Sequence, residues 1–174
     1  MRSVRYFVQP SPLGKLLIGV SPDGLCLIHW GDPDSALERL HLTFEDVRKV
    51  ASIPSVGAQL DEYLAGERRS FALPLDVTMT SSFGRRVLAE LSKVPFGELT
   101  TYGGLARRVH SSPRAVGGAV GRNPIPIVIP CHRVVAAGGA IGGFSGGLER
   151  KHFLLGLEGH PVPAEIDDRV RLAL

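Results

Sequence analysis

The sequence predicts an α+β chain in two parts: a small N-terminal α/β domain with a short antiparallel sheet, residues 1–78, and a mainly helical C-terminal domain with a helix-turn-helix, residues 79–174. Three observations support this division. Short β-branched and aromatic runs fill the first part, whereas helix start and stop signals follow one another after Thr78. Positive charge is concentrated in the second part: residues 1–78 carry 8 Lys and Arg against 10 Asp and Glu, a net −2, and residues 79–174 carry 12 against 7, a net +5.

Strands are expected at residues 5–8, 16–20 and 25–30, which are short runs of β-branched and apolar side chains. Proline and glycine between these runs mark the turns that join them. A last strand is expected at residues 71–77, and Pro74 favours an edge position because it cannot donate to a neighbouring strand.

Two helices are expected in the first part. Asp34 is predicted to cap a helix that runs to about Val50. A second helix is predicted over residues 55–66, because its apolar side chains recur at helical spacing and Gly66 provides a stop signal. This part carries no catalytic motif, so a scaffolding role is expected for it.

The second part begins and ends with a predicted helix. The first helix covers residues 83–94, with Ser81 or Ser82 as its N-cap. The last runs from Glu149 to just before Gly159, with Phe153, Leu154 and Leu157 expected to face inward. Residues 136–147 hold six glycines and are expected to form a loop that lines a pocket.

Two further helices form the predicted helix-turn-helix. One begins after Thr100-Thr101 and runs to Val109. The other covers residues 114–120, because Ser112 followed by Pro113 is typical of a helix start. Two short helices joined by a tight turn are the arrangement that many DNA-binding proteins use.

Composition excludes several classes of protein. With 44% hydrophobic and 21% charged residues, the chain is globular rather than disordered. No apolar run approaches the ~18 residues that cross a bilayer, and the N-terminus lacks a secretory segment, so no membrane association and a cytoplasmic location are expected. Cys26 and Cys131 are the only cysteines and neither has zinc-site spacing, so neither a disulfide framework nor a metal is expected.

One stretch carries chemistry, Asn123-Pro-Ile-Pro-Ile-Val-Ile-Pro-Cys-His-Arg-Val134. Its three prolines exclude a helix and place Cys131 at a turn. The imidazole of His132 and the guanidinium of Arg133 are neighbours that favour a thiolate, so Cys131 is predicted to be a nucleophile. The alternative is that Cys131 is a small core residue. Since adjacent side chains point apart, a bridging water is expected to link Cys131 and His132.

Together with Arg114-Ala-Val-Gly117, Asn123-Pro124 and Phe144-Ser-Gly-Gly147, the Pro-Cys-His-Arg sequence resembles the O6-alkylguanine-DNA alkyltransferases, also called methylated-DNA–protein-cysteine methyltransferases. The resemblance extends from about Ser82 to Gly159. It implies irreversible transfer of the alkyl group from O6-alkylguanine in DNA to Cys131, once per molecule. A thioether has no leaving-group route back to the thiol, so single turnover also follows from the chemistry.

The resemblance also implies roles for individual residues. The catalytic residues are Cys131, His132, Glu158 and Asn123. The first three form a relay from the thiol through a water to the imidazole and the carboxylate, and the amide of Asn123 braces the turn. The residues that bind the flipped base are Tyr102, Ser145, Phe144 and the carbonyl of Val134. The residues that enter the DNA groove, an arginine finger and a small-residue helix surface, are Arg114, Ala115, Gly117 and Gly118.

Gly117 and Gly118 each cost about 1 kcal/mol relative to alanine inside a helix, which indicates close packing against another helix or against DNA. The implied partner is double-stranded DNA, with no cofactor and a monomeric protein. Acceptance of O4-alkylthymine and cooperative binding stay open. One departure concerns the finger: Arg114 follows Pro113 directly, whereas about three residues usually separate them. The alternatives are an alkyltransferase-like protein that binds lesions without transfer and a helix-turn-helix transcription factor.

Overall fold

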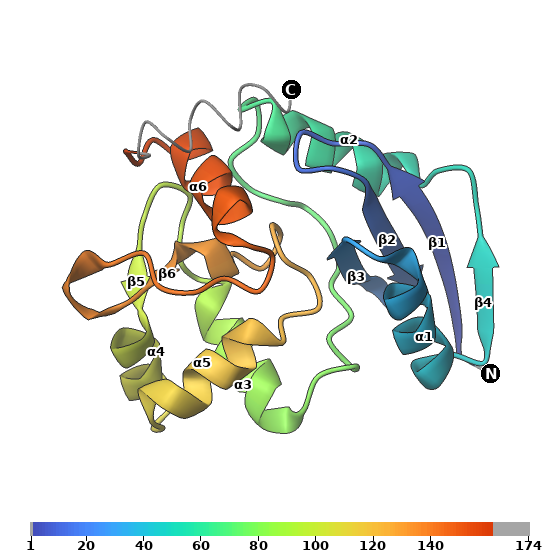
Figure 1. The fold of residues 1–174 in the computed structure, drawn as a ribbon. Coiled ribbons are helices and arrows are strands. Elements are labelled where there is room, and N and C mark those ends of the chain that lie inside the picture. Colours follow the sequence, from blue (N-terminus) through green and yellow to red (C-terminus); the bar gives the residue numbers. More distant parts are fainter. Residues whose placement is uncertain (1, 162–174) are drawn as a thin grey trace. The chain divides into compact units, whose positions relative to one another are not determined.

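The computed structural model describes residues 2–161 and divides into two units, Met1–Met79 and Thr80–Leu174 (Figure 1). The first contains the sheet and the second is mainly helical, which is the α+β arrangement that the sequence predicts. Within residues 2–161, no helix has the length and the hydropathy needed to cross a membrane.

The first unit is a four-stranded sheet with helices packed against it. The strands are β1 (Ser3–Gln9), β2 (Leu16–Ser21), β3 (Gly24–Trp30) and β4 (Asp46–Lys49), in the order β3-β2-β1-β4. The first three pair antiparallel, and β4 pairs parallel to β1. The helices are α1 (Pro33–Thr43) and α2 (Pro54–Leu64). Side chains of α1 such as Leu40 share a buried cluster with Val4 of β1 and Cys26 of β3.

Three predictions for this unit were wrong. Asp34 was expected to cap the first helix, but the N-cap is Asp32, whose carboxylate accepts from the backbone N–H groups of Asp34 and Ser35. The helix expected to reach Val50 ends at Thr43, because the backbone of Phe44 is extended, and residues 46–49 form β4 instead. The strand expected at residues 71–77 is reduced to a single bridge from Leu75 to Leu25. Pro74 accounts for this, since its carbonyl accepts a hydrogen bond from Leu25 while it has no N–H to return.

The second unit contains the predicted helices and two short pairing strands. Its regular elements are α3 (Ser82–Leu91), β5 (Thr100–Thr101), α4 (Tyr102–Arg108), α5 (Pro113–Gly121), η1 (Cys131–Arg133), β6 (Val134–Val135), η2 (Ala137–Gly139) and α6 (Leu148–Leu157). Helices α4 and α5 form the helix-turn-helix, and α3 packs against both. Strands β5 and β6 pair parallel and so connect the start of α4 to the end of η1.

Side-chain caps start the three helices of this group where the sequence predicts. The hydroxyl groups of Ser81, Thr101 and Ser112 each accept a hydrogen bond from a backbone N–H in the first turn of α3, α4 and α5 respectively. The inward face of α6 was predicted less well. Leu154 is buried as expected, but Phe153 and Leu157 are half-buried, because Lys151 and Leu155 occupy the inner face.

Candidate active site

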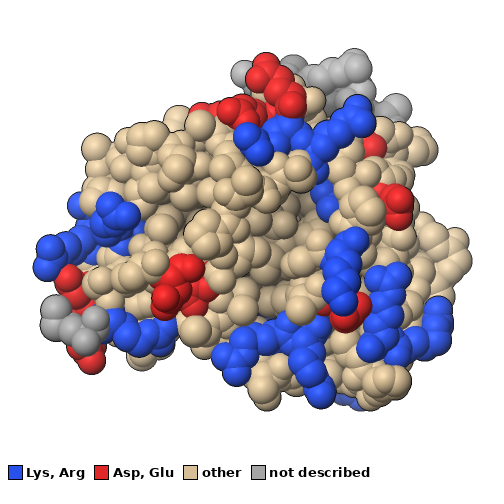
Figure 2. All heavy atoms as spheres, turned by 180° about the vertical axis from the view of Figure 1, so that it is seen from behind, with Lys and Arg blue, Asp and Glu red and all other residues tan. Residues whose placement is uncertain are grey.

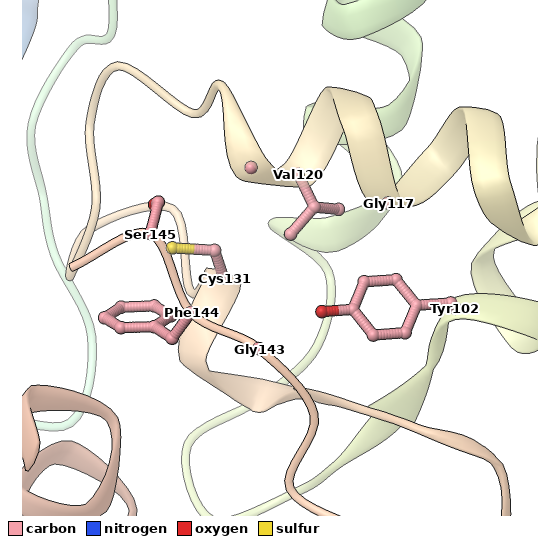
Figure 3. Close-up of a pocket in the computed structure, with 8 residues that line it drawn as sticks. Tyr102, Gly117, Val120, Cys131, Gly143, Phe144 and Ser145 are labelled. Atoms are coloured by element: carbon pink, nitrogen blue, oxygen red, sulfur yellow. The ribbon is translucent and has the colours of Figure 1, made fainter. Parts of the chain in front are cut away.

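A pocket of about 210 Å³ opens beside Cys131 in the second unit (Figure 3). It lies between the start of α4, the end of α5, η1 and residues 136–147, which we call the glycine-rich loop. The residues that line it are Tyr102, Gly117, Val120, Gly121, Cys131, Gly143, Phe144 and Ser145. In the view of Figure 3 the hydroxyl of Tyr102 points towards Cys131, and the thiol of Cys131 is directed towards the side of the pocket where Ser145 and Phe144 lie.

The turn that carries Cys131 is held by hydrogen bonds to Asn123. The Asn123 side chain donates to the carbonyl of Ile129 at 2.9 Å and accepts from the N–H of Ile125 at 3.0 Å. Between them, Ile127 is buried with a φ of 74°, a conformation that costs a β-branched residue about 1–3 kcal/mol. Burial of the neighbouring isoleucines offsets that cost, so the backbone before Cys131 is fixed as the prolines indicate.

The surroundings of Cys131 favour the thiol, whereas its sequence neighbours led us to expect the thiolate. Its side chain is 4% exposed, and burial raises its pKa to about 11. A hydrogen bond with Asn123 and the charge of Lys151 lower the pKa, but not enough to reverse the effect of burial. The guanidinium of Arg133, two residues after Cys131 in the sequence, donates to Glu158 instead.

His132 and Glu158 form the second part of the site. The imidazole Nε2 lies 2.9 Å from Oε1 of Glu158, and both side chains are fully buried. Because a carboxylate can only accept, Nε2 carries the proton and Nδ1 of a neutral imidazole is the basic nitrogen. Burial lowers the pKa of His132, opposed by the hydrogen bond and charge of Glu158. Burial therefore favours the uncharged forms of both groups, a thiol at Cys131 and a neutral imidazole at His132.

Tyr102 and the glycine-rich loop form the walls of the pocket. The phenol of Tyr102 has a raised pKa, caused by burial and by the neighbouring Cys131, so it remains a hydrogen-bond donor. Gly117 of α5 lies close to it, since a Cβ on Gly117 would stand 3.8 Å from the Tyr102 ring. Phe144 is half-buried and Ser145 is exposed on the loop beside Cys131 (Figure 3).

Lys151 holds the glycine-rich loop and was not identified from the sequence. Its side chain is fully buried. The ammonium donates to the carbonyls of Val134 at 2.8 Å, of Ile141, and of Gly143 at 3.5 Å. Lys151 thus connects the glycine-rich loop, which includes the pocket residue Gly143, to strand β6. Lys151 stands three residues before Leu154 and seven before Glu158, and on a helix this spacing places the three side chains on one face. That spacing is the sequence signal from which the burial of Lys151 could have been predicted.

Replacing Lys151 by methionine is expected to slow the reaction of Cys131 with O6-benzylguanine about tenfold, which is ~1.4 kcal/mol and close to the lower end of the range for a hydrogen bond to a charged group. The loop loses its anchor, and the pKa of Cys131 rises further because the nearby positive charge is gone. The rate constant and the hydrogen exchange of residues 136–147 measure both effects. Lys93→Met, which removes an exposed lysine, serves as the control; equal rates in the two variants would contradict this role.

The helix-turn-helix presents a positively charged surface. Arg114 and Ala115 are exposed in the first turn of α5, whereas Gly117 and Gly118 are half-buried in its middle. On the face shown in Figure 2, Lys and Arg side chains gather over the part of the second unit formed by α3, α4 and α5. The exposed arginines of these helices and their caps, which we call the arginine surface, are Arg85, Arg86, Arg107, Arg108, Arg114 and Arg122.

The structure groups the predicted site residues in three places. Lining the pocket are Cys131, Tyr102, Phe144, Ser145 and Gly117. Behind Cys131, and not in the pocket lining, are His132, Glu158, Asn123 and Val134, whose carbonyl accepts from Lys151. Exposed on α5 away from the lining are Arg114 and Ala115, with Gly118 nearby. The residues that sequence reasoning missed are Lys151, Val120, Gly121, Gly143 and the guanidinium of Arg133 as a partner of Glu158.

Both cysteines are free thiols, and Cys26 is buried in the first unit. Burial and the charge of Asp76 raise the pKa of Cys26 to about 12, so it is a poor nucleophile. Among residues 2–161, no three His, Cys, Asp or Glu side chains are grouped so that they could hold a metal ion.

Comparisons with known proteins agree over both units. Residues 82–160 match the family model of the 6-O-methylguanine DNA methyltransferase DNA binding domain, and residues 4–77 match that of its ribonuclease-like domain. A methylated-DNA–protein-cysteine methyltransferase of Mycobacterium leprae is 44% identical over 160 residues, 87% of this chain and 90% of its own. One from Methanosarcina acetivorans is 37% identical over 163 residues, 88% of this chain and 97% of its own.

Solved structures show the same fold. The Mycobacterium tuberculosis OGT in complex with DNA superimposes with a TM-score of 0.78 at 34% identity, covering 93% of this chain and 97% of that chain. The O6-methylguanine-DNA methyltransferase of the archaeon Pyrococcus kodakaraensis gives a TM-score of 0.65 at 36% identity, covering 92% of this chain and 100% of that chain.

Proposed function

Because the chain belongs to the 6-O-methylguanine DNA methyltransferase family, we propose that it repairs alkylated DNA directly, by moving the alkyl group from O6 of guanine onto Cys131. The observation that carries this assignment is the position of Cys131, whose thiol points into a pocket walled by Tyr102 and Phe144. In this proposal the helical unit binds DNA and performs the transfer, the sheet unit is a scaffold, and the protein acts in the cytoplasm as a monomer.

The reaction forms one bond and breaks one. The sulfur of Cys131 attacks the alkyl carbon, the S–C bond forms, and the bond from that carbon to O6 breaks. His132 takes the thiol proton at Nδ1, through a bridging water, and Glu158 stabilises the imidazolium that results. The departing guanine gains a proton at N1 and becomes the normal base, and the imidazolium of His132 gives up the proton that it took from the thiol, so His132 returns to its neutral form. No cofactor enters the balance, because the alkyl group comes from the DNA.

The pocket residues assist the leaving base. The raised pKa of Tyr102 keeps its hydroxyl protonated, so it can donate to the base ring, and Ser145 donates to O6 as negative charge develops there. Phe144 supplies an apolar wall on which the ring packs. The carbonyl of Val134 already accepts from Lys151, and its second lone pair receives the exocyclic amine.

The base must leave the duplex before it can reach this pocket. The arginine surface neutralises phosphates, and α5 enters the minor groove with Ala115, Gly117 and Gly118 towards the DNA. Arg114 is exposed at the start of that helix and fills the space that the base vacates. A lesion-binding protein without transfer activity is not favoured, because its pocket needs no thiol.

The test is the intact mass of the protein after incubation with an excess of duplex containing O6-methylguanine. Wild type is expected to gain one methyl group per molecule, mapped to the peptide of Cys131, and then to stop. Cys131→Ser gains none. A wild-type protein that binds the lesion without a mass gain would be a lesion-binding protein, and continued turnover on an ester or amide would make it a hydrolase.

A further inference from the structure

Arg133 is a buried charged group, next to the proposed base His132, to which the proposed transfer gives no role. It is 7% exposed and lies directly after His132 in η1. Its guanidinium donates to both carboxylate oxygens of Glu158: Nη2 to Oε1 at 2.8 Å and Nε to Oε2 at 2.9 Å. The remaining nitrogen, Nη1, donates to the carbonyl of Val94 at 2.6 Å. This is the paired geometry in which arginine fixes a carboxylate most firmly.

Glu158 is consequently shared among three donors. Oε1 accepts from His132 at 2.9 Å as well as from Arg133, and Oε2 also accepts from the backbone N–H of Gly97 at 3.1 Å. The carboxylate sits at the C-cap of α6, so these contacts connect η1, α6 and the segment after α3. Its orientation towards the imidazole is therefore set by Arg133 and by the backbone rather than by His132 alone.

The charges in this cluster balance without His132. An arginine side chain stays protonated in proteins, so Arg133 and Glu158 form a neutral pair. A buried histidine beside an uncompensated carboxylate would gain a proton, because the opposite charge favours the cation. With Arg133 present, a proton on His132 adds a second positive charge to the cluster.

We propose that Arg133 is a positioning residue, which holds Glu158 as its ion-pair partner and thereby keeps His132 a neutral imidazole able to accept the proton of Cys131. This inference rests on the proposed function, since it assigns His132 the role of base. It explains how the Glu158 carboxylate can orient the His132 imidazole without keeping that imidazole protonated.

Of the charged groups that face His132, Lys151 acts on its pKa in the same direction as Arg133, and Glu158 acts in the opposite direction. The groups that face it from η1 are Cys131, a thiol, and Arg133, and those from α6 are Lys151 and, at its C-cap, Glu158. Only Glu158 raises the pKa of His132, while burial, Arg133 and Lys151 lower it. If Arg133 is removed, Lys151 is the remaining charge that lowers the pKa of His132 against the effect of Glu158.

The direct measurement is a titration of the His132 side chain by proton–nitrogen correlation spectra, in wild type and in three variants. Arg133→Met is expected to raise the titration midpoint of His132 by ~1–3 pH units, the usual effect of a nearby charge. Arg133→Lys keeps the charge and should leave the midpoint close to that of wild type. Arg133→Met combined with Glu158→Gln removes both charges, and the midpoint should return.

The rate of Cys131 reaction with O6-benzylguanine reports the same change. In wild type the rate falls as the pH drops through the His132 pKa. In Arg133→Met this fall begins at a higher pH, so that at a fixed acidic pH the rate is about tenfold lower for each pH unit by which the midpoint has risen. A folded Arg133→Met with an unmoved midpoint would overturn the proposal. If Arg133→Met does not fold, the Glu158→Gln variant provides the test. Its His132 titration midpoint is expected to fall below that of wild type, and an unchanged midpoint would overturn the proposal.

These results are separable from the proposed function itself. The spectra of His132 require no alkyl transfer, so a wild-type protein that gains no methyl group still shows whether Arg133 controls the imidazole. Conversely, normal methyl transfer with an unmoved midpoint would leave the function intact and remove the role of Arg133.

Discussion

Cys131→Ala is expected to abolish alkyl transfer completely while the protein continues to bind DNA that contains O6-methylguanine. The sulfur of Cys131 is the one thiol in the pocket lining, and the neighbouring hydroxyls of Tyr102 and Ser145 are far weaker nucleophiles near neutral pH. The pocket walls do not depend on that sulfur, because Asn123 bonds the backbone of the turn and Lys151 bonds the loop.

Two assays separate binding from transfer in this variant. Fluorescence anisotropy compares its affinity for lesion-bearing and unmodified duplexes, and intact mass reports the transfer. Cys26→Ala is the matched control, because Cys26 is buried in the other unit with a pKa raised to about 12 and should leave transfer unchanged. A folded Cys131→Ala protein that no longer distinguishes the lesion would show that the thiol itself recognises the alkyl group.

The sequence predicted those parts of the fold that local signals determine. The helix-turn-helix has its caps at Thr101 and Ser112, as the residue types indicate, because a cap depends on a side chain and the backbone of the next turn. Strand β4 was missed, since Asp46–Lys49 has little β propensity and becomes a strand only through pairing with β1. Pairing partners far along the chain are not visible in a local pattern.

The same distinction applies to the candidate site. Motif spacing identified the residues that the structure gathers around Cys131, but not their protonation. Neighbours in sequence suggested a thiolate, whereas the pKa depends on burial and on where the Arg133 guanidinium turns, which is towards Glu158. Lys151 was missed for a related reason: a lysine is expected at the surface, and only its three carbonyl partners make its burial tolerable.

Arg114→Ala is expected to slow repair of O6-methylguanine in duplex DNA about a hundredfold, while the reaction with free O6-benzylguanine changes less than about twofold, a difference of ~2.7 kcal/mol between the two substrates. Arg114 is exposed at the start of α5 and lies outside the pocket lining, so its loss leaves the thiol and the base site unchanged. The free base needs no flipping, whereas the duplex loses the side chain that, in the proposed function, fills the space vacated by the base.

Arg122→Ala provides the matched comparison, because Arg122 is also exposed, lies at the C-cap of the same helix, and its replacement removes the same charge. A purely electrostatic role predicts equal losses for the two variants on duplex DNA, both shrinking as salt rises. If Arg114 instead fills the space vacated by the base, Arg114→Ala is expected to lose more rate on duplex DNA than Arg122→Ala, and part of that loss should not depend on salt. Single-turnover rates on both substrates at two salt concentrations distinguish these outcomes, and they also show whether the short turn between Val109 and Pro113 still delivers Arg114 to the DNA.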